Sequence, residues 1–483
     1  MSCWGAGVHS KRERGQIAVN QFEERLERCL QAEINGCQAL VKAERLSGGA
    51  SQETYRLEIA TEQGPRTLAM RRAPGGEHIE PTPGHPGLDV EALLMRSARD
   101  AGVPEPEVFY VLEQKDELGD GFIMEWLEGI ALGARVVRSP ELDEVRPRLA
   151  FMCGEILARI HGIDLDATGL AQKLDVLSPE AYVEQTWERY RLFDTAQPMI
   201  DYAGRWLMDH LPSDFTPALV HNDFRNGNVM FSPDGVVAVL DWEVAHIGDP
   251  MRDLGWICTN SWRFGRSDMP VGGFGTYDDL FAGYESVSGV PVDRQRVKFW
   301  EVFGSFWWAI GCLGMAEHYR TGPDKTVERP AIGRRSSECQ VDAVNLLIPG
   351  PVELVEADST ATNDMPRVDE LLTSVRDFLH KDVMEATEGR TNFLARVAGN
   401  SLDIVLRDAR TGAQARDREY RRLQALLGEG SLTDLRWKLV HGLRDGSIAL
   451  DMPGLDEHLR LTVVNQIAID QPKYSGFRDA LSG

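Results

Sequence analysis

The sequence predicts an α+β fold in which a small β-rich lobe precedes a larger helical lobe and an appended helical domain. Strand-like runs separated by glycines and prolines fill the first part of the chain, and helical spacing of apolar residues dominates afterwards. An acidic segment bounded by prolines, residues 349–366, follows the helical lobe and has the composition of a linker. The predicted divisions are a disordered start (1–20), the β-rich lobe (21–130), the helical lobe (131–348), the linker (349–366) and a helical accessory domain (367–483).

The β-rich lobe begins with helical spacing over residues 21–41. In "ERLSGGASQETYRLEI" (44–59) a glycine pair separates two strand-like runs, and "RTLAMRRAP" (66–74) is a third strand that a proline ends. "DVEALLMRSARDAG" (89–102) is a helix with a glycine at its C-terminus. "EVFYVLEQ" and "GFIMEWLEG" (107–114 and 121–129) then predict two antiparallel strands. These elements predict a small sheet with one inserted helix.

The helical lobe begins with two amphipathic stretches, "RPRLAFMCGEILARIHGID" (146–164) and "YVEQTWERYRLF" (182–193). Its longest uncharged run, 302–316, is too short to span a bilayer, so it predicts a buried helix. No apolar core of a signal peptide occurs in the first twenty residues. Seven scattered cysteines without C-x-x-C spacing fit reduced thiols, so we expect a cytoplasmic protein without membrane contact.

The net charge of −23 argues against a nucleic-acid partner, because phosphate contacts need clustered Lys and Arg. The acidity also sets a condition on any chemistry with phosphates. Local positive charge or a divalent cation would have to offset the carboxylates at such a site.

Polar residues crowd into "LVHNDFRNGNVMF" (219–231), where His221, Asp223 and Asn228 form the pattern H-x-D-x-x-x-x-N. The following "VMF", "SPDG" and "VVAVLD" predict a strand, a turn and a strand. Because a hairpin folds the chain back on itself, we expect Asp241 to lie beside Asn228.

Phosphoryl transfer needs a carboxylate at the acceptor hydroxyl and oxygen ligands that hold Mg²⁺ on the nucleotide phosphates. Asp223 would be the base, and Asn228 and Asp241 would be the metal ligands. The alternative is a polar hairpin in which Asp and Asn only cap turns, and for any one of these residues that alternative is favoured. The joint spacing on two strands with apolar flanks favours the catalytic interpretation.

These motifs resemble those of the aminoglycoside phosphotransferase-like kinases, a family that shares the protein-kinase fold. "HNDFRNGNVMF" is similar to their H-G-D-x-x-x-x-N catalytic loop, with Asn222 where glycine is usual. "LDWEVAHIGDPMRDLGW" (240–256) is similar to their metal-binding aspartate and the G-D-P-x-x-D-L motif that follows it. "ILARIHGID" and "EQTWERY" resemble a narrower branch that accompanies acyl-CoA dehydrogenases, and the C-terminal domain resembles an uncharacterised helical domain found with such kinases.

The resemblance implies further site residues. "LAMR" places Arg71 where these kinases carry a phosphate-holding lysine, with Arg72 as the fallback and Glu91 as the helix partner. It also implies backbone contacts to the phosphates and to adenine, at Gly48, Gly49, Ala50 and Ser51 and at Glu125 and Trp126, respectively.

The other polar residues of these motifs have a supporting part. We expect His221, Asp249 and Asp253 to brace the catalytic loop instead of touching substrate.

We therefore expect an ATP- and Mg²⁺-dependent phosphotransferase acting on a hydroxyl of a small molecule, including a hydroxyacyl-CoA. One alternative is a nucleotide-binding pseudokinase whose C-terminal domain recruits a partner or self-associates. Another is an aminoglycoside or amino-alcohol kinase, which would need a pocket dense in carboxylates, whereas an acyl-CoA acceptor would need basic residues. The sequence leaves open the acceptor, the choice between ATP and GTP and the oligomeric state.

Overall fold

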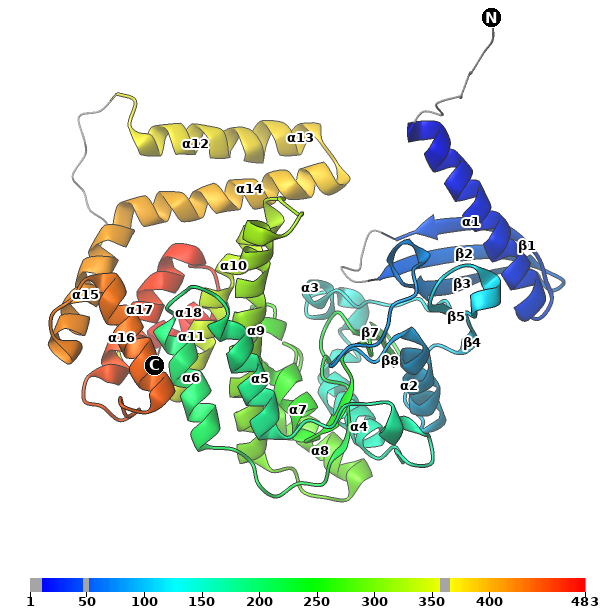
Figure 1. Ribbon diagram of the computed structural model, residues 1–483, viewed down its shortest axis with the longest axis horizontal. Helices are drawn as coiled ribbons and strands as arrows, with labels where there is room; N and C mark the ends of the chain where they lie inside the picture. Colours follow the sequence, from blue (N-terminus) through cyan, green and yellow to red (C-terminus); the bar gives the residue numbers. More distant parts are fainter. Residues whose placement is uncertain (1–10, 47–51, 357–364, 483) are drawn as a thin grey trace, which may run out of the picture. The chain divides into compact units, whose positions relative to one another are not determined.

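The computed structural model describes residues 11–46, 52–356 and 365–482. They divide into two compact units, in each of which segments distant in the sequence come together (Figure 1). Unit 1 consists of Met1–Val176, Pro217–Pro250 and Ala282–Val290. Unit 2 consists of Leu177–Thr216, Met251–Phe281 and Pro291–Gly483.

The centre of unit 1 is a five-stranded antiparallel sheet with the strand order β1-β2-β3-β5-β4. Side chains of β2 alternate between the core and the outside, so Tyr55, Leu57 and Ile59 point inward. Helix α1 covers this face and adds Leu26 and Leu30 to the same core. The elements are α1 (Lys11–Glu33), β1 (Cys37–Arg45), β2 (Glu53–Thr61), β3 (Gly64–Arg72), β4 (Val108–Val111) and β5 (Gly121–Glu125).

The start of the chain differs from the sequence prediction in one respect. Helical spacing continues to residue 41, but α1 ends at Glu33 and β1 begins at Cys37. Between them Gly36 has a φ of +73°, a conformation that glycine adopts without strain and that ends a helix. The expected disordered segment 1–20 lies outside the described residues as far as residue 10, and α1 begins at Lys11.

The rest of unit 1 carries the predicted catalytic motif. Strands β7 and β8 form the predicted hairpin, with Val229 opposite Val239, and β6 pairs antiparallel with β9. The elements are α2 (Leu88–Asp100), α3 (Gly133–Val136), α4 (Arg146–His161), β6 (Ala218–Val220), β7 (Val229–Ser232), β8 (Gly235–Val239) and β9 (His246–Gly248). Helix α8 (Tyr277–Ser288) begins in unit 2 and ends in unit 1.

Unit 2 is helical throughout its described part. The predicted buried helix, 302–316, lies within α9, where Val302, Phe303, Phe306 and Ile310 are buried and Trp307 is partly buried. Among the described residues no helix is long and apolar enough to cross a membrane. The helices before the linker are α5 (Pro179–Arg191), α6 (Pro198–Asp209), α7 (Met251–Cys258), α9 (Arg294–Thr321), α10 (Glu328–Arg334) and α11 (Ser336–Leu347).

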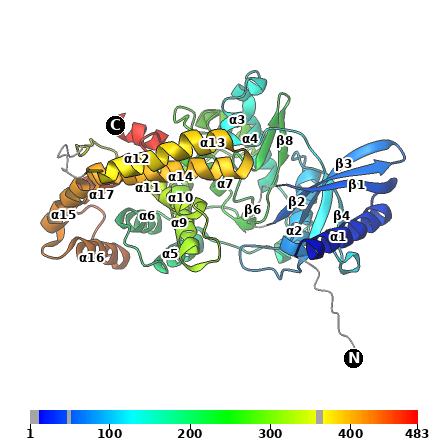
Figure 2. The same ribbon diagram turned by 90° about the horizontal axis from the view of Figure 1, so that it is seen from above.

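The helices after the linker belong to the same unit. Helices α12 and α14 run antiparallel side by side (Figures 1 and 2), α16 packs on α6, and α17 and α18 pack on α11. These helices are α12 (Val368–Phe378), α13 (Met384–Ala386), α14 (Gly389–Arg407), α15 (Ala413–Leu427), α16 (Leu432–Asp445), α17 (Leu455–Asp470) and α18 (Ser475–Ser482).

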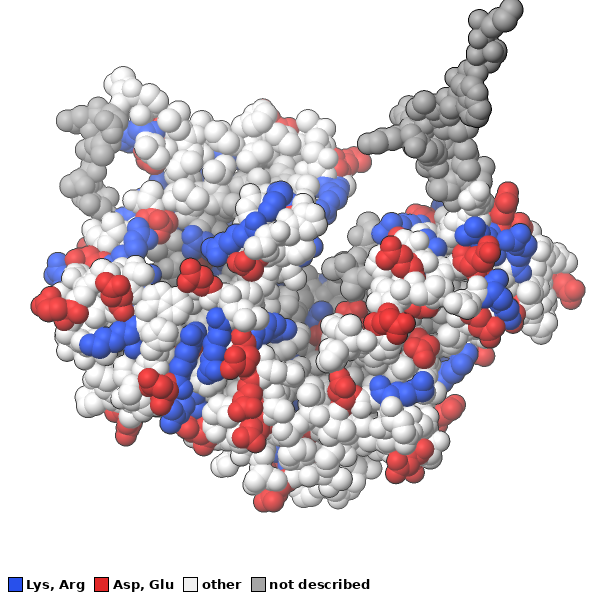
Figure 3. All heavy atoms as spheres, viewed as in Figure 1, with Lys and Arg blue, Asp and Glu red and all other residues white. Residues whose placement is uncertain are grey.

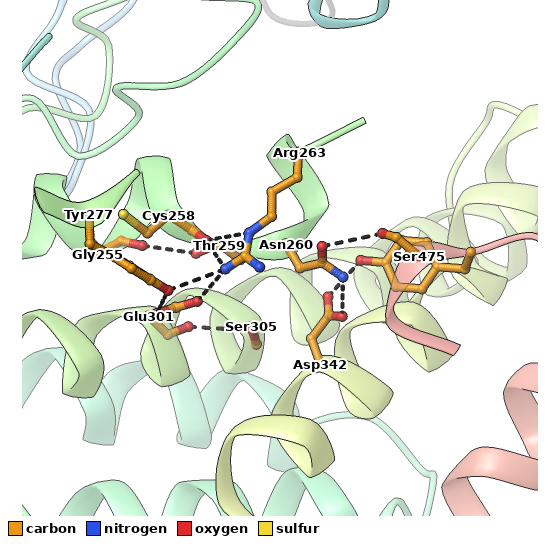
Figure 4. A network of polar contacts seen from close by, with 11 residues as sticks. Gly255, Cys258, Thr259, Asn260, Arg263, Tyr277, Glu301, Ser305, Asp342 and Ser475 are labelled. Atoms are coloured by element: carbon orange, nitrogen blue, oxygen red, sulfur yellow. Dashed lines mark hydrogen bonds and ion pairs between the residues drawn. The ribbon is translucent and has the colours of Figure 1, made fainter. Parts of the chain in front are cut away.

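Buried polar contacts hold this packing together. Asn260 donates to the Asp342 carboxylate at 2.7 Å, and Ser475 at the start of α18 donates to the Asn260 amide oxygen at 3.3 Å (Figure 4). In the same network Arg263 donates to Glu301 at 2.7 Å. Burial raises the pKa of Asp342 to about 7. The C-terminal helix α18 is therefore fixed to α11 and to the segment around Asn260 through paired polar groups.

The architecture confirms the predicted α+β, kinase-like fold followed by a helical C-terminal region. On the face seen in Figure 3, Lys and Arg are interspersed with Asp and Glu.

Candidate active site

The predicted catalytic loop joins β6 to β7 and is built around His221, whose side chain is fully buried. The backbone N–H of Asp223 donates to His221 Nδ1 at 3.2 Å, and His221 Nε2 lies 3.2 Å from the Leu240 carbonyl oxygen. The imidazole also packs on the Trp242 ring, with 4.5 Å between centroids. His221 thus ties the loop to the end of β8, in keeping with the bracing role expected for it.

Asp223 is held from both sides within this loop. Asn228 donates through Nδ2 to Asp223 Oδ2 at 2.6 Å, and Arg225 donates through Nε to Asp223 Oδ1 at 2.9 Å. Because the amide nitrogen of Asn228 faces Asp223, its amide oxygen points away and keeps its acceptor capacity. The carboxylate is therefore oriented by a cation and by an amide.

Asn222 occupies the position where glycine is usual, and its backbone explains why asparagine fits there. Its φ is +71°, in the left-handed region that asparagine tolerates better than other non-glycine residues. Its side-chain Nδ2 also donates to the Val244 carbonyl oxygen at 3.2 Å. Asn222 therefore replaces glycine conformationally and adds a link to the segment after Asp241.

The hairpin brings Asp241 to the catalytic loop, as the sequence predicted. The backbone N–H of Leu240 donates to the Asn228 carbonyl oxygen at 2.7 Å, which places the next residue, Asp241, at the same end of the hairpin. Asp241 has a φ of +71° and makes an ion pair with Arg71. The register of β7 and β8 thus brings Asp223, the predicted base, together with Asn228 and Asp241.

Arg71 lies on β3 and connects three acidic side chains. Its guanidinium pairs with Asp241, and its Nη1 lies 3.1 Å from Glu91 Oε1. Its Nη2 lies 3.8 Å from Glu243 Oε2, and its Nε donates to Gln52. A guanidinium can hold several carboxylates at once because its donors form a planar fork.

The neighbouring Arg72 points elsewhere. It donates through Nε to Glu53 at 2.8 Å, and its guanidinium stacks over the Phe22 ring with 4.3 Å to the centroid. Arg71, and not the fallback Arg72, is therefore the arginine brought together with Asp241.

Glu91 is the most perturbed acid of this group. Its side chain is 1% exposed on α2, and burial raises its pKa to about 7 although Arg71 lowers it. Asp241 and Glu243 add to the rise, because a third negative charge nearby disfavours ionisation. The ion pair between Glu91 and Arg71 therefore forms fully only above neutral pH.

The predicted adenine-binding strand end is also formed. The Glu125 N–H donates to the Glu107 carbonyl oxygen at 2.8 Å, so that donor is used within the sheet. Trp126 donates through Nε1 to Glu128 at 2.6 Å. A Cβ on Gly129 would lie 2.4 Å from Met230 Cγ and 3.0 Å from the Phe231 carbonyl oxygen, so a larger residue there would displace the Met230 side chain.

Gly48, Gly49, Ala50 and Ser51, the predicted phosphate-covering residues, lie outside the described residues.

Three residues of this cluster were not singled out from the sequence. Arg225 and Glu243 each stand two positions after a predicted site aspartate, and alternate residues of an extended chain point to the same side. That spacing was the available signal for both. Gln52, which also donates to Glu243 at 3.3 Å, carries no sequence signal because its contact spans 191 positions.

The donor set fits a hard divalent cation. Asp241 and the Asn228 amide supply oxygen ligands, which suit Mg²⁺, and Mg²⁺ takes most of its remaining ligands from water and phosphate. Among the described residues, no group of three or more His, Cys, Asp or Glu is arranged to hold a metal on its own.

Comparison with known proteins agrees with this geometry. The family model of the phosphotransferase enzyme family matches residues 42–290, just over half of the chain. A domain of unknown function matches residues 385–474. A solved Ralstonia eutropha protein assigned as an aminoglycoside phosphotransferase superposes with a TM-score of 0.55, at 24% identity, over 66% of this chain and 96% of that one. At that identity the likeness establishes the fold.

Two animal proteins are similar in sequence. Acyl-CoA dehydrogenase family member 10 of Mus musculus is 30% identical over 296 residues, which is 57% of this chain and 26% of the relative. Acyl-CoA dehydrogenase family member 11 of Gallus gallus is 28% identical over 261 residues, which is 52% of this chain and 32% of the relative. The chain thus spans about a quarter to a third of these relatives. From the match over residues 42–290 and the shared fold, the chain belongs to the phosphotransferase enzyme family.

Proposed function

We propose that this protein transfers the γ-phosphoryl group of ATP to a hydroxyl of a small molecule, in a reaction that requires Mg²⁺. The observation that carries the proposal is the placement of Asp223 between Arg225 and Asn228, at distances of 2.9 Å and 2.6 Å. An oriented carboxylate beside a cation and a metal-binding amide is what transfer to a hydroxyl requires.

Each residue has a defined part in the proposed reaction. Asp223 accepts the proton of the acceptor hydroxyl as its oxygen bonds to the γ-phosphorus, and the bond to the β,γ-bridging oxygen breaks, which releases ADP. Arg225 neutralises charge on the transferred group. Asn228 and Asp241 would hold Mg²⁺, which neutralises charge on the nucleotide phosphates when it is bound.

Arg71 would bind the nucleotide phosphates once its carboxylate partners are shared with the cation. In the structure it already neutralises Asp241, with Glu91 and Glu243 nearby. Positioning and charge neutralisation supply most of the rate enhancement in phosphoryl transfer, because the transition state is loose.

For the acceptor we propose a hydroxyacyl-CoA or a related anionic metabolite. Both relatives reported above are named acyl-CoA dehydrogenase family members, which links this kind of domain to acyl-CoA chemistry. The charges of the cluster do not by themselves select the acceptor, because its two arginines stand among the carboxylates of Asp223, Asp241, Glu91 and Glu243. The choice of an acyl-CoA acceptor therefore rests on the relatives, and an amino sugar is the alternative that the screen tests.

The test is a phosphotransfer screen with ATP and Mg²⁺ against hydroxyacyl-CoA esters, amino sugars and amino alcohols. Wild type is compared with Asp223→Asn and Asp241→Ala. The matched control is Asp234→Asn, which changes an exposed aspartate in the turn of the same hairpin. We expect transfer to a hydroxyacyl-CoA in wild type and control, a fall of about 10²- to 10⁴-fold in Asp223→Asn, and loss of Mg²⁺-dependent ATP binding in Asp241→Ala.

Two outcomes would contradict the proposal. If ATP binds in wild type but no acceptor is phosphorylated, the chain is a nucleotide-binding pseudokinase. If amino sugars react and acyl-CoA esters do not, the proposed acceptor class is contradicted, whereas the proposed phosphotransfer activity is confirmed.

A further inference from the structure

A cavity of about 240 Å³ lies within unit 2, far along the chain from the catalytic loop. Its walls come from the start of α6, from α9, α10 and α11, and from α15, α16 and α17. The last three helices fall in the domain of unknown function, whereas the first four precede the linker. The cavity is therefore formed only where the accessory helices meet the helical lobe.

The charged residues of the cavity wall are balanced in pairs. Arg436 donates through Nε to Glu419 at 2.7 Å, and Arg334 donates to Asp470 at 2.9 Å. Both carboxylates are buried, so each needs its arginine as a counterion. The carboxylates would repel an anionic ligand, and the arginines would repel a cationic one. The wall therefore disfavours a ligand that carries a net charge of either sign.

One polar residue of the wall is buried without a partner. His458 is 1% exposed, and neither of its ring nitrogens has a hydrogen-bond partner among the residues that the structure describes. Burial and the charges of Arg422 and Arg436 lower its pKa to about 3, so the ring is neutral at physiological pH. A neutral imidazole offers one N–H donor and one nitrogen acceptor. Such a group, left unsatisfied in the interior, destabilises the protein, so it points to a hydrogen-bonding occupant.

The remaining wall combines uncharged polar groups with an apolar side. Hydroxyls and amides come from residues such as Ser337, Gln340 and Thr462, and the apolar side includes Leu313 and Val463. A hydroxyl group both donates and accepts, which suits a neutral imidazole, while the C–H faces of a cyclic polyol or sugar suit the apolar side. The volume equals about eight water molecules at about 30 Å³ each, which is room for one small molecule.

We propose that this cavity binds a small, uncharged, polyhydroxylated molecule, such as a cyclitol, a monosaccharide or a nucleoside, and that His458 contacts its hydroxyl groups. The bound molecule lies against both α11 and α17, so its binding stabilises the packing of the accessory helices on the helical lobe. This site is separate from the proposed phosphotransfer site, because no lining residue belongs to the catalytic loop or the β7–β8 hairpin.

The test is isothermal titration of the full chain with myo-inositol, D-glucose and adenosine, in parallel with thermal unfolding. Glucose 6-phosphate and glucosamine serve as charged comparators of similar shape. We expect saturable binding of at least one uncharged probe with a rise in the unfolding midpoint of about 2 °C or more at saturation, and at least tenfold weaker binding of its charged relatives.

Two variants locate the binding. His458→Leu removes the unpartnered imidazole at similar size, so we expect the unfolding midpoint without probe to be kept or raised, and affinity to fall at least tenfold. Ala196→Leu fills the cavity from the segment before α6 without removing a polar group, and it tests the site if His458→Leu folds poorly. His441→Leu, an exposed histidine of the same unit, is the matched control and should bind as wild type does.

The remaining outcomes overturn the proposal. Binding that survives Ala196→Leu would place the probe elsewhere, including at the acceptor site. Tighter binding of a charged comparator would contradict the balanced wall, and absence of binding by all three uncharged probes would mean that the cavity holds only water. None of these outcomes bears on phosphotransfer, which Asp223→Asn tests separately.

Discussion

Arg225 donates through Nε to Asp223 Oδ1 at 2.9 Å, so the residue two positions after the proposed base also holds it in place. The Arg225 side chain is 24% exposed, so part of it is open to solvent. We propose that this one guanidinium both orients Asp223 and neutralises the group that is transferred.

Replacing Arg225 with methionine should lower kcat by about 10²-fold, the usual effect of removing one donor that stabilises a developing negative charge. Arg225→Lys should recover part of that loss, since the charge returns without the planar donor pair. Steady-state phosphotransfer kinetics measure both, with Arg148→Met, an exposed arginine of α4, as the control. Activity of Arg225→Met within threefold of wild type would show that the ion pair is only structural.

Arg71→Lys should raise the KM for ATP by about tenfold, because a lysine cannot keep the contacts to Glu91 and Gln52 while it pairs with Asp241. Arg71→Met should have a larger effect, since Asp241 and Glu243 then repel each other and the phosphates. Direct ATP titration in Mg²⁺ separates binding from turnover. Unchanged ATP affinity in Arg71→Lys would contradict this role.

The pKa of Glu91 predicts a pH dependence of stability. Its folded pKa of about 7 lies above the ordinary value of 4.5, so the folded state holds a proton that the unfolded state has lost. The free energy of unfolding should therefore fall as the pH rises from about 4.5 to 7, by about 3 kcal/mol from this group. Chemical denaturation at several pH values in this window measures the slope, which Glu91→Gln should reduce and the exposed control Glu62→Gln should leave unchanged.

Asn222→Gly should leave activity close to wild type and change stability by no more than about 1 kcal/mol, because glycine adopts the φ of +71° easily, which offsets the loss of side-chain contacts such as the bond to Val244. Asn222→Val should destabilise by roughly 2 kcal/mol or more, since a β-branched residue is strained there. Thermal unfolding and phosphotransfer assays measure both. Equal stability of the two variants would refute the conformational explanation for Asn222.

One of the ion pairs between the accessory helices and the helical lobe has a fully buried carboxylate. Arg444 on α16 donates to Asp201 on α6 at 2.6 Å, and Asp201, which is fully buried, also accepts from Trp187 and Tyr190. Arg444→Met should destabilise unit 2 by about 3–5 kcal/mol, because it leaves the carboxylate buried without a counterion.

The double variant Arg444→Met with Asp201→Asn tests the cause of that loss. It should be more stable than Arg444→Met alone, because the buried charge is gone while the amide can still accept a hydrogen bond. A double variant that is less stable than both single ones would show that the two residues act independently.

The sequence alone determined the α+β fold, the hairpin and the grouping of Asp223, Asn228 and Asp241. Short-range rules suffice for these, since alternation defines the strands, the turn sequence defines the hairpin, and the hairpin register brings Asp241 to Asn228. The end of α1 at Glu33 was missed because helical spacing continued past Gly36.

Only the tertiary structure decided which side chains join these groups. Arg71 and Arg72 are adjacent in sequence, and their assignment to Asp241 and to Glu53 depends on which face of β3 each occupies. The cavity around His458 unites residues that stand more than two hundred positions apart, from the start of α6 to α17. Local periodicity of the sequence predicts that such residues are buried, but only long-range packing determines which residues they contact.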